Sequence, residues 1–143
     1  MMAKDQDRKE RAIRIATALQ PELLALARRL HDAPELSGEE EESARQVSAL
    51  LASHGFAVEF ETGGLPTAFV ARRHLGSAGP VVAYLAEYDA LPDIGHGCGH
   101  NLIAAAAVGA GVSVAETMAD RPGEVRVIGT PAEETLGGKV ILV

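Results

Sequence analysis

What the sequence contains little of narrows the kind of protein it can encode. Its 143 residues include one cysteine, no tryptophan and only 3% aromatic residues. A single cysteine cannot form a disulfide within the chain, which favours a reducing compartment, the cytoplasm. Because aromatic residues are scarce while 47% of the residues are hydrophobic, we expect a core built from alanine, leucine, valine and isoleucine.

The chain also lacks an excess of basic residues and a long apolar run. Its net charge is −7, which argues against a nucleic-acid partner because phosphate binding requires a basic face. The polar N-terminus does not resemble a secretory signal, and the longest apolar run, 102–115, is shorter than the roughly 20 residues that cross a bilayer. We therefore expect one soluble domain over residues 1–143, with neither a nucleic-acid nor a membrane partner.

The N-terminal third is predicted to be helical. Apolar residues recur at helical spacing before and after Pro21, which suits the first turn of a second helix. Ser37 and Glu40 have the spacing of a capping box at the start of a third helix, which Gly55 ends. The acidic run 39–42 at the start of this helix is expected to be a solvated surface near the positive end of the helix dipole.

Apolar segments in the rest of the chain alternate between strand and helix patterns. Segments 56–62 and 67–73 are predicted to be adjacent antiparallel strands, and the nearly continuous apolar run 80–86 to be a strand buried on both faces. A helix over 100–118, apolar on all sides, follows, and then a strand over 124–129. This alternation predicts an α/β fold in which a sheet with one parallel pair is flanked by helices.

Two loops leave the carboxyl ends of the predicted parallel strands. The loop over 87–101 contains the only cysteine, two of the five histidines and three carboxylates, and the loop over 130–138 contains a Glu-Glu pair. Ligands in open α/β sheets bind beyond the carboxyl ends of strands. The residues expected to converge there are Cys98, His100, Glu133 and Glu134.

These residue types suit a metal ion. Thiolate, imidazole and carboxylate ligands together favour zinc, and manganese where carboxylates dominate. Of two adjacent glutamates, one can bind the metal while the other takes a proton from metal-bound water. The pattern therefore favours a metal-dependent hydrolase.

Other interpretations stay open at this point. The glutamate pair could simply begin a helix after Pro131, where acidic residues are favoured. Cys98 could be a nucleophile with His96 or His100 as its base, although the glutamate pair would then have no role. The chain could also be a metal-binding module without catalytic activity.

Three motifs carry a resemblance to a known family. They are YLAEYDALP at 84–92, GHGCGHN at 95–101 and GTPAEE at 129–134. In order and spacing they resemble the aminoacylase/carboxypeptidase family of two-metal metallopeptidases, and within it the amidohydrolase branch of p-aminobenzoyl-glutamate hydrolases and related dipeptidases. The match runs from about Pro21 to the end of the chain. It implies hydrolysis of amide bonds in small substrates such as dipeptides, N-acyl amino acids or aminobenzoyl-glutamate.

The resemblance also implies a role for each site residue. Cys98, His100 and Glu134 would be ligands of zinc or manganese in a two-metal site. Glu133 would be the general base that activates the bridging water, and Asp89 would orient a ligand from behind.

One position departs from the wider family. Glu87 stands where that family places a metal-binding histidine. Because the amidohydrolase branch uses the Cys-Gly-His motif instead, we assign Glu87 no ligand role.

Members of this family are much longer, and their catalytic domain is interrupted by a dimerisation domain. The resemblance therefore implies that residues 1–143 are the N-terminal portion of a zinc-exopeptidase-like catalytic domain without the inserted domain. It also implies a homo-oligomer for a full-length protein. Further histidine ligands and the residues that grip the substrate carboxylate would lie beyond Val143. Since a zinc site needs about four donors, we expect the 143-residue chain alone to bind metal loosely and to be inactive or very weakly active.

Overall fold

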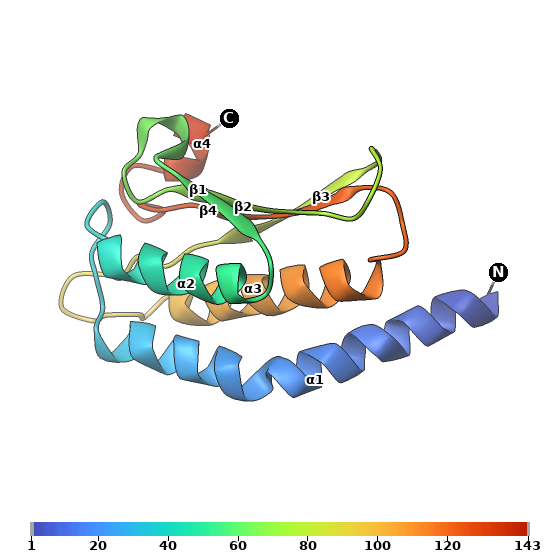
Figure 1. The fold of residues 1–143 in the computed structure, drawn as a ribbon. Helices are drawn as coiled ribbons and strands as arrows, with labels where there is room; N and C mark the ends of the chain where they lie inside the picture. Colours follow the sequence, from blue (N-terminus) through green and yellow to red (C-terminus); the bar gives the residue numbers. More distant parts are fainter. Residues whose placement is uncertain (1, 143) are drawn as a thin grey trace.

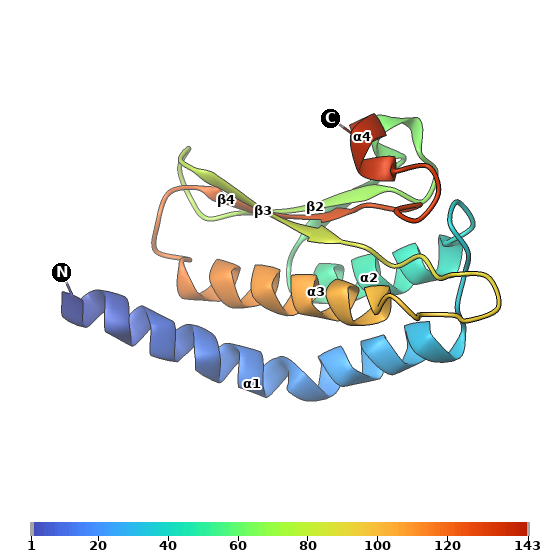
Figure 2. The same ribbon diagram turned by 180° about the vertical axis from the view of Figure 1, so that it is seen from behind.

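A four-stranded mixed sheet with three helices on one of its faces forms the body of the protein (Figures 1 and 2). The computed structural model describes residues 2–142. The elements in chain order are α1 Met2–Asp32, α2 Glu41–Ser53, β1 Ala57–Phe60, the short 3-10 helix η1 Thr62–Gly64, β2 Phe69–His74, β3 Val81–Ala86, α3 His100–Thr117, β4 Glu124–Gly129 and α4 Gly138–Leu142. The α/β fold with helices beside a sheet is thus confirmed.

The strands lie in the order β1-β2-β4-β3. β1 and β2 are antiparallel neighbours, as predicted, and β3 and β4 form the predicted parallel pair, joined through α3. In this register Ala86, the last residue of β3, lies opposite Gly129, the last residue of β4. The two loops that follow these strands therefore start side by side at the carboxyl ends of β3 and β4.

The prediction that β3 is buried on both faces is wrong. β3 is an edge strand whose only partner among residues 2–142 is β4, and Val81, Val82 and Leu85 are each about half exposed. Tyr84 lies near Gly111 of α3, and because side chains alternate along a strand, Val81 and Leu85 point to the opposite face of the sheet. An apolar run is compatible with a buried strand, but the position of the strand in the sheet decides whether its side chains are buried.

Helix α1 continues through Pro21, where the sequence predicted two helices. Proline lacks an amide proton and clashes with the carbonyl four residues earlier, so it kinks a helix that packing holds together. Figure 1 shows that α1 bends in its middle. Its second half contributes Leu26 and Leu30, both fully buried, to the core beneath the sheet.

The predicted capping box at the start of α2 is also wrong. The helix begins at Glu41, and Ser37 donates its hydroxyl hydrogen to Asp89 instead of capping an amide. Glu35 takes the capping role, because its carboxylate accepts hydrogen bonds from the amides of Glu42 and Ser43 at 3.1 and 2.6 Å. Glu35 thus satisfies free backbone amides of the first helical turn, although it lies outside the spacing of a capping box.

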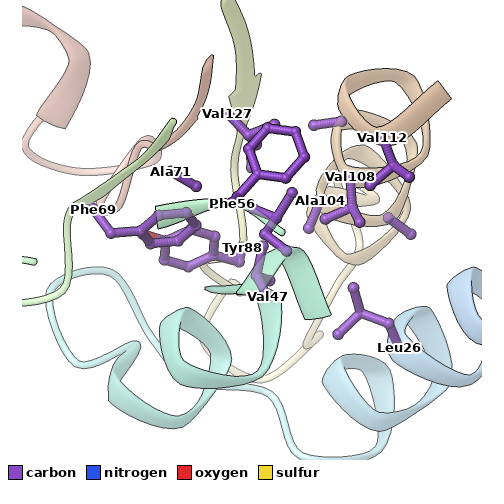
Figure 3. Close-up of a cluster of buried hydrophobic side chains, with 14 of the residues drawn as sticks. Leu26, Val47, Phe56, Phe69, Ala71, Tyr88, Ala104, Val108, Val112 and Val127 are labelled. Atoms are coloured by element: carbon purple, nitrogen blue, oxygen red, sulfur yellow. The ribbon is translucent and has the colours of Figure 1, made fainter. Parts of the chain in front are cut away.

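The core lies between the sheet and the three helices. Figure 3 shows core side chains from the helices and from the sheet, among them Leu26 of α1, Val108 of α3 and Val127 of β4. Helix α3 packs closely against its neighbours because it carries glycines. A Cβ atom on Gly111 would collide with Val127, and one on Gly109 with Leu23. No helix within residues 2–142 has both the length and the apolar character needed to cross a membrane.

Candidate metal centre

The two strand-end loops meet at His100, the first residue of α3. Its imidazole is 5% exposed, and its Nε2 atom lies 3.7 Å from Oε1 of Glu134 and 3.8 Å from Oε2 of Glu133. Each of these residues offers one ligand atom, and the three atoms lie within 4.8 Å of one another. The structure therefore brings together residues that are more than thirty positions apart in the sequence, because β3 and β4 end side by side.

Asp89 lies behind His100, with its carboxylate fully buried. Nδ1 of His100 is 2.9 Å from the backbone oxygen of Asp89, which accepts its hydrogen, and also 2.9 Å from Oδ1. The other carboxylate oxygen, Oδ2, accepts hydrogen bonds from the Ser37 hydroxyl at 2.6 Å and from the Glu134 amide at 3.1 Å. One buried side chain thus contacts both loops.

The hydrogen bond at Nδ1 determines what the other imidazole nitrogen can do. Because Nδ1 carries the hydrogen, a neutral ring presents its lone pair at Nε2. Carboxylate oxygens of Glu87, Glu134 and Glu133 surround this nitrogen at 3.2, 3.7 and 3.8 Å. A cation placed among these oxygens and the Nε2 lone pair would be stabilised by their negative charge. One imidazole nitrogen with several carboxylate oxygens is a donor set that fits zinc or manganese.

Cys98 adjoins this cluster without being one of its three mutually close residues. Its side chain is exposed, and the neighbouring Glu134 carboxylate raises the pKa of the Cys98 thiol, with the negative charge of Glu133 adding to the shift. A thiol with a raised pKa stays protonated at neutral pH and is a poor nucleophile. A cation among the carboxylates would reverse this effect of their charge.

His96 does not form the thiol–imidazole pair that a cysteine nucleophile needs. Both of its ring nitrogens are buried, and neither hydrogen-bonds to another described residue. Burial lowers the pKa of His96. The structure therefore gives no support to the interpretation of Cys98 as a nucleophile with His96 as its base.

Two further charged residues lie at the candidate site: Glu87, to which no ligand role was assigned from the sequence, and Lys139, which the sequence did not indicate. Glu87 forms an ion pair with Lys139, and the Lys139 ammonium lies 3.9 Å from Oε1 of Glu133. Glu87 could have been found from the sequence, because it stands two residues before Asp89, and alternate residues of an extended segment point to the same side. Lys139 had no such signal, since its place depends on the turn before α4.

The chain is similar in sequence to known hydrolases over most of its length. A mouse Xaa-Arg dipeptidase is 43% identical over 131 residues, which cover 83% of this chain and 30% of the dipeptidase. A p-aminobenzoyl-glutamate hydrolase chain of Escherichia coli strain K12 is 36% identical over 137 residues, covering 82% of this chain and 28% of that protein. This chain thus spans less than a third of the length of either relative. No protein-family model matches it.

The fold agrees with these relatives. A dinuclear metal-binding peptidase of the M20 family from Bacillus subtilis superposes with a TM-score of 0.72 and 30% sequence identity, over 82% of this chain and 36% of the peptidase. The sequence motifs at both strand ends resemble the same family. The chain belongs to the M20 family, the aminoacylase/carboxypeptidase family of two-metal metallopeptidases, and has the fold of the N-terminal part of its catalytic domain.

Proposed function

We propose that this chain supplies one part of the active site of a metal-dependent hydrolase that cleaves amide bonds in small substrates. The observation that carries the proposal is the meeting of His100 with Glu133 and Glu134 within 4.8 Å, at the ends of two parallel strands. The names of the relatives support the substrate class, since they include a dipeptidase and an aminobenzoyl-glutamate hydrolase. We accordingly propose dipeptides, N-acyl amino acids and aminobenzoyl-glutamate as substrates.

Cys98, His100 and Glu134 would hold zinc or manganese as part of a two-metal site. Asp89 keeps the imidazole of His100 oriented through Nδ1, so that Nε2 points at the carboxylates. When bound, the metal ions polarise the substrate carbonyl and lower the pKa of water. Because zinc needs about four donors, we expect loose metal binding by the 143-residue chain alone.

Glu133 is the residue that would move the proton. Its side chain is 35% exposed, so water can reach it, whereas Glu134 is 22% exposed and held through its amide by Asp89. As the water oxygen forms a bond with the carbonyl carbon, the Glu133 carboxylate takes a proton from that water. It then passes this proton to the amine nitrogen as the carbon–nitrogen bond breaks. The products are a carboxylic acid and a free amine.

The product of the complete reading frame is the protein to assay. We expect it to hydrolyse at least one of aminobenzoyl-glutamate, an aminoacyl dipeptide or an N-acetyl amino acid when zinc or manganese is added, and to lose this activity with a chelator. The 143-residue chain should show little or none. Absence of any amide hydrolysis by the complete product with either metal would contradict the proposal. We further propose a cytoplasmic location, because a thiol ligand needs reducing conditions, and a homo-oligomer for the complete product, as in the longer family members.

A further inference from the structure

We propose that Glu40 is a positioning residue of the candidate metal centre, which holds the backbone of Ala132 and thereby aims Glu133 and Glu134 at His100. This inference rests on the proposed function for its consequence, metal binding. Its structural basis is separate, because it depends on hydrogen bonds within the protein. The sequence predicted that the acidic run 39–42 is solvated, and for Glu40 this is wrong, because its side chain is fully buried.

The Glu40 carboxylate is satisfied by three hydrogen bonds. Oε1 accepts from the amides of Gly38 at 2.8 Å and Ala132 at 2.7 Å, and Oε2 accepts from the Thr67 hydroxyl at 3.2 Å. A carboxylate removed from water is costly unless its oxygens are hydrogen-bonded. Here the bonds join three segments of the chain, and one of them reaches the residue directly before the glutamate pair.

Ala132 is the point at which the loop after β4 changes direction. Its φ angle is 55°, in the left-handed region that residues with a Cβ rarely adopt. Such a conformation persists only where its surroundings hold it. Ala132 is buried, its carbonyl accepts hydrogen bonds from the amides of Leu136 and Gly138 at 3.2 and 3.3 Å, and its own amide donates to Glu40. Without Glu40 this buried amide would have no acceptor.

Glu40 also reaches the other loop of the site. Thr67, its third hydrogen-bond partner, accepts through its backbone carbonyl a hydrogen bond from the Tyr88 hydroxyl at 2.7 Å. Tyr88 directly precedes Asp89, which contacts His100. Burial raises the pKa of Tyr88, and the charges of Glu40 and Asp89 add to this shift, so the phenol remains a hydrogen-bond donor. Glu40 is therefore connected to both halves of the metal centre.

Two substitutions separate the effect of the side-chain length of Glu40 from the effect of its charge. E40Q removes the charge but keeps an oxygen at the same distance, so it should still accept from Ala132. E40D keeps the charge but is shorter by one carbon–carbon bond, about 1.5 Å, and should lose this hydrogen bond. E41Q removes one charge from the exposed neighbour Glu41 and is the matched control. Metal affinity is measured by zinc competition against a chromophoric chelator, and the Ala132 amide by hydrogen exchange.

We expect E40Q and E41Q to bind zinc within about threefold of the wild-type chain and to keep the Ala132 amide protected. E40D should bind zinc about tenfold more weakly and exchange this amide faster, because a buried amide without an acceptor carries a penalty of that order. Wild-type affinity and protection in E40D would overturn the proposal. The proposal would also be overturned if E40Q bound zinc as weakly as E40D, because the charge of Glu40 and not its side-chain length would then determine zinc affinity.

The experiment distinguishes failure of this inference from failure of the proposed function. A wild-type chain that binds no zinc would contradict the proposed function, while exchange at Ala132 would still decide whether Glu40 holds the loop. If E40D does not fold, hydrogen exchange of the Ala132 amide in E40Q and in the wild type tests the inference. Slow Ala132 exchange in both the wild type and E40Q supports the positioning role, and fast exchange in either contradicts it.

Discussion

Asp89 accepts a hydrogen bond from the backbone amide of Glu134, at 3.1 Å and across 45 positions of sequence. The same carboxylate lies 2.9 Å from Nδ1 of His100. One buried side chain therefore touches a candidate ligand on each of the two loops. The relative position of His100 and Glu134 should depend on it.

We expect D89N to weaken zinc binding by about tenfold or more, the usual loss when a residue that orients a metal ligand is changed. Asparagine has the same shape, but one of its two carboxylate oxygens is replaced by a donor group. At the position of Oδ1 that group would place its hydrogens against Nδ1–H of His100, and at the position of Oδ2 it could not accept from the Ser37 hydroxyl or the Glu134 amide. D93N is the matched control, because Asp93 is exposed and its φ angle of 67° is one that asparagine tolerates. Equal zinc affinities for D89N, D93N and wild type would contradict the role of Asp89.

Substitutions of the two adjacent glutamates should have different effects on turnover and on metal content. In the complete product, E133Q should lower kcat by about a hundredfold or more, the range for loss of a general base, with metal content unchanged. E134Q should lose metal, because the substitution removes a candidate ligand. Metal content after dialysis and turnover with a dipeptide are measured for both variants. Loss of metal in E133Q, with metal retained in E134Q, would reverse the assignment.

Lys139 should compete with the metal ion for the carboxylates it faces. Its ammonium pairs with Glu87 and lies 3.9 Å from Glu133, and its side chain is 34% exposed. Removing this positive charge in K139Q should raise zinc affinity a few-fold, a modest change because solvent screens a partly exposed pair. K139R keeps the charge and should bind zinc as the wild type does. Weaker zinc binding by K139Q than by K139R would show that Lys139 assists the site instead.

His96 should make stability fall as the solution becomes acidic. Burial lowers its pKa in the folded protein, whereas in the unfolded chain it is about 6.5. Below pH 6.5 the unfolded state therefore binds the proton first, and the free energy of unfolding falls until the pH reaches the lower pKa of the folded state. Urea denaturation at pH 7.5 and pH 5 should show a smaller loss of stability for H96Q than for wild type. An identical loss in both would show that His96 is not responsible.

The meeting of His100 with the glutamate pair was predictable from the sequence, because it depends on a simple rule of topology. An apolar strand, a buried helix and a second strand form a parallel unit, and the loops after its strands start together. In the structure Ala86 lies opposite Gly129, and His100 meets the glutamate pair. The helix His100–Thr117 also begins and ends within one residue of its predicted range.

The errors concern features that neighbours distant in the sequence decide. Glu40 is one of four consecutive glutamates, and its hydrogen bonds with Thr67 and with the amide of Ala132, 27 and 92 positions away, distinguish it from its solvated neighbours. Pro21 lies inside a continuous helix because α1 packs on α3 along much of its length (Figure 2). No local pattern contains this information. Lys139 enters the site for the same kind of reason, through the turn that precedes α4.

Cobalt(II) titration tests the central claim most directly, because the visible spectrum of this ion reports the ligands around it. The claim is that both strand-end loops bind one metal centre through Cys98, His100 and Glu134. We predict that the wild-type chain shows d–d bands together with a thiolate-to-cobalt charge-transfer band. C98S should lose the charge-transfer band alone, while H100A and E134A should weaken both sets of bands. A wild-type chain whose spectrum is that of free cobalt, or is the same in all three variants, would contradict the account.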